Sequence, residues 1–281
     1  MKNKLLIIDG HNLLFQMFFG MPARIVNKDG IAIQGVLGFV GALNKIISMI
    51  EPTHIVVLFD SEQHNDRKDI VEEYKANRID YTDVPEEENP FSQLPYVYKA
   101  LDFMKIKHTE VIGYETDDVI ASYVIRYSRK ISCLISSWDS DYFQLINESV
   151  NVLRYRGKKT MLCDVDFIQN KFGIAPEVYE DFKSLTGDKA DNIKGADKVG
   201  LKTAAKLLNQ FGNLENILGN VEQIEKPSIR KSIMESKDRL QKNYQIIKLT
   251  DRAEIPFMLE ELKCNGERLK TNDVLVDIGL K

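Results

Sequence analysis

The first half of the chain alternates short apolar runs with longer segments whose apolar residues recur at helical spacing. The apolar runs, which predict buried strands, lie at residues 5–9, 54–60, 107–112, 131–137 and 151–156. Helical spacing between the runs predicts helices at residues 34–50, 97–106 and 116–130. Strands that alternate with helices favour a mostly parallel, twisted sheet with helices on both faces. We therefore predict an α/β domain over residues 1–165.

From about residue 166 the pattern changes to amphipathic helical segments, and no strand is expected. These segments lie at residues 165–173, 176–187, 201–212, 213–220 and 228–248. Gly173, Gly187, Gly212 and Gly219 each stand at the end of a helical run, as glycines do when they cap a helix C-terminus. The second half thus predicts a helical domain over residues 166–281.

A polar insertion at residues 62–95 separates two of the predicted elements. Its charges are dense and its apolar residues sparse, which is typical of a solvated loop with one helix. A long polar segment directly after a strand is also where lids and substrate clamps occur. If the segment is helical, Arg67, Tyr74 and Arg78 lie near one face and place an aromatic ring beside two cations. The neighbouring Asp69, Glu72 and Glu73 support the alternative of a plain solvated face.

Acidic residues occur at five places where strands end or loops begin. They are Asp9, Asp60, Glu115, Asp117, Asp118, Asp139, Asp141, Asp188 and Asp191. The carboxyl ends of strands in an open α/β sheet meet at one crevice, so these distant residues are expected to lie together. Two carboxylates about 4 Å apart repel each other by roughly 4 kcal/mol at an effective dielectric near 20. The set therefore predicts bound cations.

Each acidic motif also has an ordinary structural explanation when it is taken alone. Asp9 precedes a glycine, as in many turns, and Asp60 is equally ambiguous. Asp117 and Asp118 suit the first turn of a helix because the helix dipole favours acids there. The occurrence of all five motifs in one chain is harder to explain in this way. Oxygen ligands without a supporting histidine or cysteine motif indicate Mg²⁺ or Mn²⁺ rather than zinc.

Composition changes this picture only slightly. The net charge of −4 and the pI near 5.7 are unusual for a nucleic-acid-binding protein. If metal ions neutralise the nine acids, however, the net charge becomes +5, so any basic surface must be local. Three cysteines without zinc spacing fit a reducing cytoplasm. The chain has no apolar run of the roughly 18 residues that a membrane helix needs, which argues against a membrane protein.

A second motif follows the last pair of acids. Residues 195–208 read as a glycine hairpin leading into a helix, whose N-terminal N–H groups suit a phosphate. Lys198, Lys202 and Lys206 add positive charge. The pattern is typical of a helix-hairpin-helix that binds a DNA backbone, although a helix-turn-helix packing corner reads similarly.

Taken together, the motifs resemble the bacterial 5′ nucleases. This family comprises the flap endonuclease or 5′-to-3′ exonuclease that also forms the N-terminal domain of DNA polymerase I. The matching motifs are IDGHN, FD, GYETDDVIA, DSDYFQL, LTGDKADNI and GLKTAAKLL, in the family's order and spacing. They cover nearly the whole chain, and because no polymerase segment follows them in this sequence, the chain is expected to resemble the stand-alone form of the nuclease. The resemblance implies a PIN-like α/β nuclease core, a helical arch at residues 62–95 and a C-terminal helix-hairpin-helix (H3TH) domain.

The resemblance also implies roles for matching residues. The first metal site would contain Asp9, Asp60, Glu115, Asp117 and Asp118, and the second would contain Asp139, Asp141, Asp188 and Asp191. In the arch, Lys75 and Arg78 would contact the scissile phosphate, Tyr74 would stack on the terminal base, and Arg67 would begin the arch helix. The duplex would contact Gly195, Lys198, Gly200, Lys202 and Thr203, with a K⁺ ion held by hairpin carbonyls in relatives.

Two positions depart from the family pattern. Lys198 replaces the middle glycine of the hairpin, where φ is expected to be positive, which weakens the case for K⁺ there. Asp66 replaces the usual aromatic residue before Arg67, which affects how a strand would thread through the arch.

The expected activity is two-metal hydrolysis of phosphodiester bonds at 5′ ends and 5′ flaps of branched duplex DNA, in replication and repair, by a cytoplasmic monomer. Asp9, Asp60, Asp117 and Asp118, with Lys75 and Arg78, would be the catalytic residues. Two other classes of function stay open at this point. One is a DNA-junction-binding protein with weak catalysis; the other is a PIN-like ribonuclease, which would lack the hairpin at residues 195–208.

Overall fold

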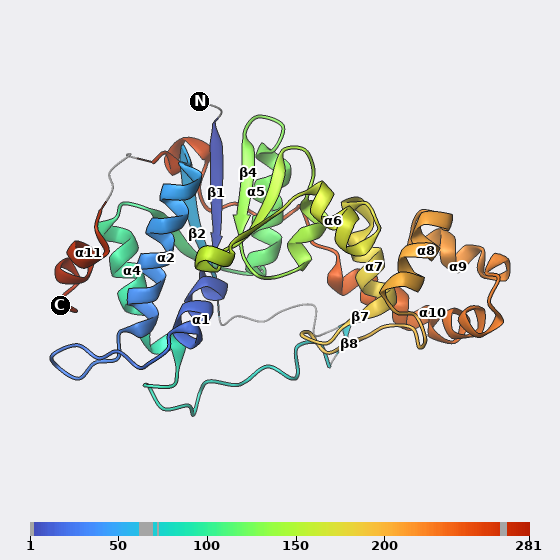
Figure 1. Cartoon of the computed structure of the whole chain (residues 1–281), viewed down its shortest axis with the longest axis horizontal. Coiled ribbons are helices and arrows are strands. Elements are labelled where there is room, and N and C mark those ends of the chain that lie inside the picture. Colours follow the sequence, from blue (N-terminus) through green and yellow to red (C-terminus); the bar gives the residue numbers. More distant parts are fainter. Residues whose placement is uncertain (1–2, 62–69, 72, 265–268) are drawn as a thin grey trace.

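The computed structural model describes residues 3–61, 70–71, 73–264 and 269–281. A six-stranded sheet lies between two layers of helices, and a helical domain extends from one side (Figure 1). The strands are β1 (Lys4–Asp9), β2 (His54–Asp60), β3 (Lys107–Val111), β4 (Ser132–Ser136), β5 (Val150–Arg154) and β6 (Met161–Cys163). Their order across the sheet is β3-β2-β1-β4-β5-β6. The predicted α/β class is therefore confirmed.

Parallel pairing brings the carboxyl ends of the central strands to one edge. β1 pairs in parallel with both β2 and β4, and β3 and β5 extend the sheet in the same direction. Residues 5–8 of β1 are completely buried, as a strand covered on both faces requires. Among the described strands of this sheet, only β6 runs antiparallel. It was not predicted because its three residues include the exposed Met161 and Leu162.

Helices cover both faces of the sheet. One face carries α1 (Gly10–Gly20), α2 (Gln34–Ile50) and α4 (Leu94–Phe103), and the other carries α5 (Thr116–Tyr127) and α6 (Val165–Phe172). Helix α1 was not predicted, because its own apolar residues are spread around the helix and form no single apolar stripe. Asp9 caps α1 by accepting a hydrogen bond from the Asn12 amide (3.1 Å). Gly10 follows because a Cβ there would lie 2.4 Å from the Phe59 ring.

The helical domain contains α7 (Tyr179–Thr186), α8 (Leu201–Phe211), α9 (Leu214–Gly219) and α10 (Pro227–Ile247). After α10 the chain returns along α5, and the last helix, α11 (Thr271–Asp277), packs against α2 and α4. Figure 1 shows α11 beside α4, at the opposite end of the molecule from α8 and α9. The helical domain and the last helix of the chain thus lie on different parts of the fold.

The prediction that this half contains no strand was wrong. Gly187–Asp188 forms β7 and Ile193–Lys194 forms β8, a small antiparallel hairpin. Two glycines allow its tight closure: Gly187 has φ +77°, and a Cβ on either Gly187 or Gly195 would lie 2.5 Å from the other's backbone nitrogen. A two-residue strand has no hydrophobic periodicity, so tertiary packing alone reveals it.

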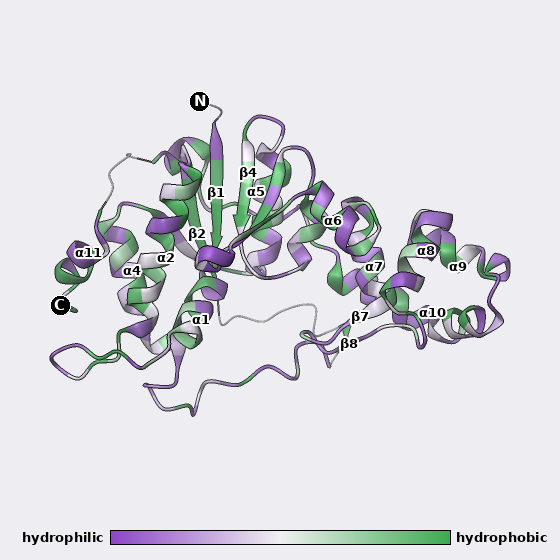
Figure 2. Cartoon of the chain, in the orientation of Figure 1, coloured by the Kyte–Doolittle hydropathy of each residue, from purple (hydrophilic) through white to green (hydrophobic). Residues whose placement is uncertain are grey.

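The polar insertion is described only in part. Arg67, predicted to begin an arch helix, lies outside the described residues. Residues 73–89 form turns, with neither helix nor strand, and cross to the second domain. Figure 2 shows this segment as largely hydrophilic, in contrast to the apolar strands of the sheet. Tyr74 anchors it to the second domain, because this residue is 2 % exposed and packs with Ile193, Ile246 and Ile247.

Candidate active site

The structure brings the predicted acids together at the carboxyl edge of the sheet. Asp9 and Asp60 end β1 and β2, and Asp139 and Asp141 follow β4. Glu115, Asp117 and Asp118 begin α5, which starts at the same edge because it follows β3. Asp188 and Asp191 reach this region from β7 and from the turn that connects it to β8. Five separate segments therefore contribute to one acidic site.

A buried tyrosine links the acids of β1 and α5. The Tyr142 hydroxyl donates to Asp117 Oδ1 (2.5 Å) and lies 3.4 Å from Asp9 Oδ2. Ser137 Oγ also donates to Asp9 Oδ2 (2.9 Å). Tyr142 is fully buried, and its burial and the adjacent Asp117 and Asp9 raise the pKa of its phenol well above the ordinary value. It therefore stays protonated and serves as a permanent donor to the acids.

Two further acids are held by backbone amides. Asp60 Oδ1 accepts from the Thr116 amide (2.9 Å), which joins the end of β2 to the start of α5. Asp118 Oδ1 accepts from the Thr250 amide (2.9 Å), in the segment that returns after α10. Asp118 is 7 % exposed. In this arrangement Asp118 ties the helical domain to α5, a contact that its sequence motif does not predict.

A lysine that sequence reasoning missed lies among the second group of acids. Lys183 of α7 is 4 % exposed, and its ammonium contacts both Asp141 and Asp188. Burial would lower the pKa of Lys183, but Asp141, Asp139 and Asp188 raise it well above the ordinary value. Lys183 lies on the buried face of an amphipathic helix, five residues before Asp188. That position in the sequence was the one signal that could have indicated its place near the acids.

Two cations of the insertion pair with acids of the site. Lys75 Nζ donates to Glu115 Oε1 (2.9 Å), with both side chains nearly buried. Arg78 Nη2 donates to Asp191 Oδ1 (3.0 Å) from a half-exposed position. The Lys75 amide also donates to the Asp191 carbonyl (3.1 Å). Through these contacts the insertion lies against the acids. Tyr74, which was predicted to stack on a base, is buried against Ile193, Ile246 and Ile247.

Mutual repulsion and burial dominate the electrostatics of the site. Burial, with Asp117 and Asp60, raises the pKa of Asp9 to about 7. Burial and the neighbouring Asp141 and Asp117 raise the pKa of Asp139 well above its ordinary value. Burial alone would raise the pKa of Asp188 as well, but its contact with Lys183 lowers it. The site therefore holds more negative charge than Lys183, Lys75 and Arg78 offset.

No three carboxylate, imidazole or thiol side chains among the described residues are arranged to ligate one ion directly. Lys183 separates Asp141 from Asp188, and the Tyr142 hydroxyl stands beside both Asp9 and Asp117. The donors nevertheless suit a hard divalent cation, because all are carboxylate oxygens whose repulsion such an ion would relieve. To bind a metal ion, the carboxylates would have to exchange their contacts with Lys183 and Tyr142 for contacts with the ion.

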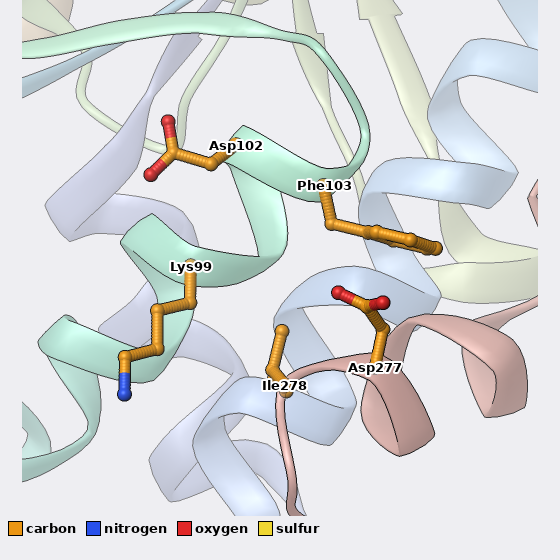
Figure 3. A pocket seen from close by; sticks show the side chains of 5 residues that line it. All are labelled: Lys99, Asp102, Phe103, Asp277 and Ile278. Carbon is orange, nitrogen blue, oxygen red and sulfur yellow. The ribbon is translucent and has the colours of Figure 1, made fainter.

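A hollow of about 440 Å³ lies elsewhere, between α4 and α11 (Figure 3). It is lined by Lys99, Asp102, Phe103, Asp277 and Ile278. None of the predicted site residues lines it, so it plays no part in this site.

The segment predicted to bind DNA is a turn between β8 and α8. Gly195 is buried beside Gly187, and Gly200 precedes the first turn of α8. Lys198 has φ +65°, a conformation that costs a non-glycine residue about 1–2 kcal/mol. Its side chain and that of Lys202 are exposed, and Thr203 is half-buried. The lysine that replaces the family's glycine at position 198 therefore has a strained backbone and an exposed side chain.

The raised pKa of Asp9 predicts that the metal-free protein loses stability as pH rises. Its folded pKa of about 7 exceeds the ordinary 3.8, so its contribution is complete below about pH 4 and lost as pH rises through 7. The shift corresponds to at most about 4 kcal/mol. In chelator, the melting temperature should fall from pH 5.5 to 8.5, and the fall should be smaller for Asp9→Asn, which retains the helix cap.

Glu180 also has a pKa raised to about 7 by burial, so some pH dependence will remain in both proteins. The difference between wild type and Asp9→Asn is therefore the quantity to measure. Identical pH dependence in the two proteins would contradict the buried, repelled state of Asp9.

Comparison with known proteins identifies the class of this fold and site. Residues 4–173 match the family described as 5′-3′ exonuclease, N-terminal resolvase-like domain, and residues 174–270 match 5′-3′ exonuclease, C-terminal SAM fold. The chain belongs to the 5′-3′ exonuclease family. It is 32% identical to the 5′-3′ exonuclease of Aquifex aeolicus, over 99% of this chain and 92% of that protein. It is also 32% identical to DNA polymerase I of Caldicellulosiruptor bescii, but spans only a third of its length.

Solved structures share the fold at lower identity. The T5 D15 protein co-crystallised with metal ions has a TM-score of 0.73 at 20% identity, covering 98% of each chain. The catalytic core of Rad2 in complex with DNA substrate has a TM-score of 0.62 at 14% identity, covering 99% of this chain and 93% of that one.

Within the described residues of this protein, no helix is long and apolar enough to cross a membrane.

Proposed function

We propose that this protein is a metal-dependent nuclease that hydrolyses phosphodiester bonds at 5′ ends and 5′ flaps of branched duplex DNA. The observation that carries the proposal is the convergence of acids from five segments at the carboxyl edge of the sheet. Lys75 and Arg78 lie directly against these acids. Family membership supports the same reaction, as does the description of a related T5 protein as a flap endonuclease bound to DNA and metal ions.

Two divalent ions, Mg²⁺ or Mn²⁺, fit the oxygen-only donors of the site. Asp9, Asp60, Glu115, Asp117 and Asp118 would hold one, and Asp139, Asp141, Asp188 and Asp191 would hold the other. When bound, such ions activate a water and stabilise the leaving oxygen. The contact of Lys183 with Asp141 and Asp188 supports the second site, because that pair already accommodates a positive charge.

The chain's own cations would position the substrate. Lys75 and Arg78 are each held by one carboxylate at the site, so a scissile phosphate arriving there offers them a second anionic partner. Binding of the DNA would replace the contacts of Lys75 and Arg78 with Glu115 and Asp191. If Tyr74 then left its apolar cluster, its ring would become available to stack on a base. The products would carry a 5′-phosphate and a 3′-hydroxyl.

The hairpin and the start of α8 would bind the duplex backbone. Lys198 and Lys202 are exposed there, and the N-terminal amides of α8 follow Gly200. A K⁺ ion fits this hairpin less well than it would a glycine hairpin. The Gly195 carbonyl accepts from Arg239 (3.0 Å) and the Asp197 carbonyl accepts from Ser232 (2.5 Å), so two hairpin carbonyls already have protein donors.

We further propose a cytoplasmic monomer in which a boundary near residue 165 separates catalysis from duplex binding. Cys133 and Cys163 are free and buried, and burial raises the pKa of both thiols, in keeping with a reducing compartment. The return segment after α10 would keep the two domains in contact, because the Thr250 and Ala253 amides donate to Asp118 and Ser122 of α5.

The test is cleavage of a labelled 5′-flap DNA by purified protein in Mg²⁺ and in chelator. Cleavage should occur only with metal. Lys75→Ala and Arg78→Ala should each lower the single-turnover rate by about 10²–10³, the effect of removing one preorganised electrostatic donor. Lys99→Ala, on α4 and away from the acids, is the control. Cleavage that persists in chelator would point to another mechanism; binding without cleavage in Mg²⁺ would favour a junction-binding protein.

A further inference from the structure

Helix α10 carries a row of polar side chains that face into the helical domain. Ser232, Ser236, Arg239 and Asn243 recur every three or four residues, which places them on one face of the helix. The two serines and the asparagine are at most 6 % exposed, and Arg239 is half-buried. Figure 1 shows α10 along the lower edge of the helical domain, below α8. We call these four residues the polar stripe of α10.

The polar stripe donates hydrogen bonds to backbone carbonyls in and next to the turn between β8 and α8. The bonds run from Asn243 Nδ2 to Lys194 (2.9 Å), from Arg239 Nη2 to Gly195 (3.0 Å) and from Ser232 Oγ to Asp197 (2.5 Å). The Ala196 carbonyl accepts from the Val199 amide instead (3.2 Å). Four consecutive carbonyls, at residues 194–197, therefore have protein donors.

The charge of Arg239 is not neutralised by an acid. Its Nη2 donates to the Gly195 carbonyl and to Ser236 Oγ (2.8 Å), which are both neutral acceptors. Its Nε is buried and has no acceptor among the described residues. In the same part of the chain, no carboxylate forms an ion pair with Arg239. Because a guanidinium stays protonated in proteins, a full positive charge lies against the turn.

This charge makes the turn a poor site for the K⁺ ion that the family resemblance implies. A carbonyl oxygen has two lone pairs, so Arg239 does not exclude an ion from Gly195 by occupancy alone. An ion on the same oxygen would, however, lie a few ångströms from the guanidinium, and like charges at such a distance repel each other. The exposed Lys198 brings a second cation to the same turn. The donors and charges of this turn therefore do not fit K⁺.

We propose that Arg239 takes the place of a monovalent cation, so that this protein binds duplex DNA at the turn without K⁺. The inference rests on the proposed function, because it assumes that the turn and the start of α8 contact the duplex backbone. The polar stripe fixes the turn carbonyls, as a bound ion would, and Arg239 supplies the positive charge from within the chain. Arg239 acts through the turn, and it is therefore a positioning residue.

The test measures binding of a plain DNA duplex in chelator, where cleavage cannot interfere. The two conditions are KCl and N-methyl-D-glucamine chloride at equal ionic strength, because the large organic cation cannot bind among carbonyls. Wild type should bind equally in the two salts. Arg239→Met should bind about tenfold more weakly in the organic salt, the effect of losing one charge-assisted contact. K⁺ should restore part of this loss, because the Gly195 carbonyl then lacks its cation. Arg239→Lys, which keeps the charge, should bind like wild type in both salts.

The matched control is Lys237→Gln, an exposed change on another face of α10, which should alter binding in neither salt. A wild type that binds more tightly in KCl than in the organic salt, or that binds duplex in neither, would overturn the inference. That comparison needs no variant, so it decides the question even if Arg239→Met does not fold. A folded Arg239→Met that binds like wild type in both salts would also overturn it. Equal binding by wild type without flap cleavage in Mg²⁺ would support the inference and count against the proposed nuclease function alone.

Discussion

Asp188→Asn combined with Asp191→Asn is expected to lower the single-turnover rate of flap cleavage by about 10³ or more, with little effect on DNA affinity. Loss of a single electrostatic stabiliser already costs about 10²–10³ in rate. The double substitution removes two charges from the proposed second metal site. Asparagine keeps the shape of both side chains and can still accept the Ala190 amide bond that Asp188 makes (2.8 Å). The turn between β7 and β8 should therefore persist.

Flap cleavage and flap binding should be measured on the same preparations, with melting temperature as a check on folding. Asp238→Asn, an exposed change on α10, is the control and should retain full activity. Full activity in the double variant would remove Asp188 and Asp191 from the proposed metal ligands. Loss of binding together with cleavage would show that these acids serve chiefly to hold the insertion through Arg78.

The second large effect concerns Lys183. Lys183→Met should destabilise the metal-free protein by about 3–5 kcal/mol, because it leaves the buried Asp141 and the partly buried Asp188 without their cation. The melting temperature should fall by roughly 10 °C. A divalent ion that binds between these acids would replace the lost charge, so Mn²⁺ should raise the melting temperature of the variant more than that of wild type.

Thermal unfolding in chelator and in Mn²⁺ provides this comparison for both proteins. Lys231→Met, an exposed change on α10, should leave both melting temperatures close to wild type. A variant that is as stable as wild type in chelator would show that the ammonium does not balance the acids. Destabilisation that Mn²⁺ does not relieve would argue against a metal site at Asp141 and Asp188.

Sequence reasoning succeeded where hydrophobic pattern and chain position coincide. β1, β2 and β4 are continuous apolar runs ending at or just before acids, and parallel pairing then requires those acids to lie at one edge. It failed for α1, whose apolar residues surround the helix, and for β7 and β8, which are too short for any periodicity. Tyr142 and Lys183 were also missed, because polar residue types usually lie at the surface. Only Lys183 has a local pattern that indicates burial, namely its place on the buried face of α7.

The sequence by itself determined the class of fold, the position of the acids along the chain and the family of the protein. The hydrophobic pattern, which depends on residues close in sequence, is enough to predict the class of fold. The order and spacing of the motifs are enough to indicate the family. Only the tertiary structure decided which cations face the acids, that Tyr74 is buried, and that Asp118 accepts a hydrogen bond from Thr250. Those contacts join residues that are tens of positions or more apart in the sequence. Tertiary packing therefore decides how far apart the side chains lie and which charges neutralise one another.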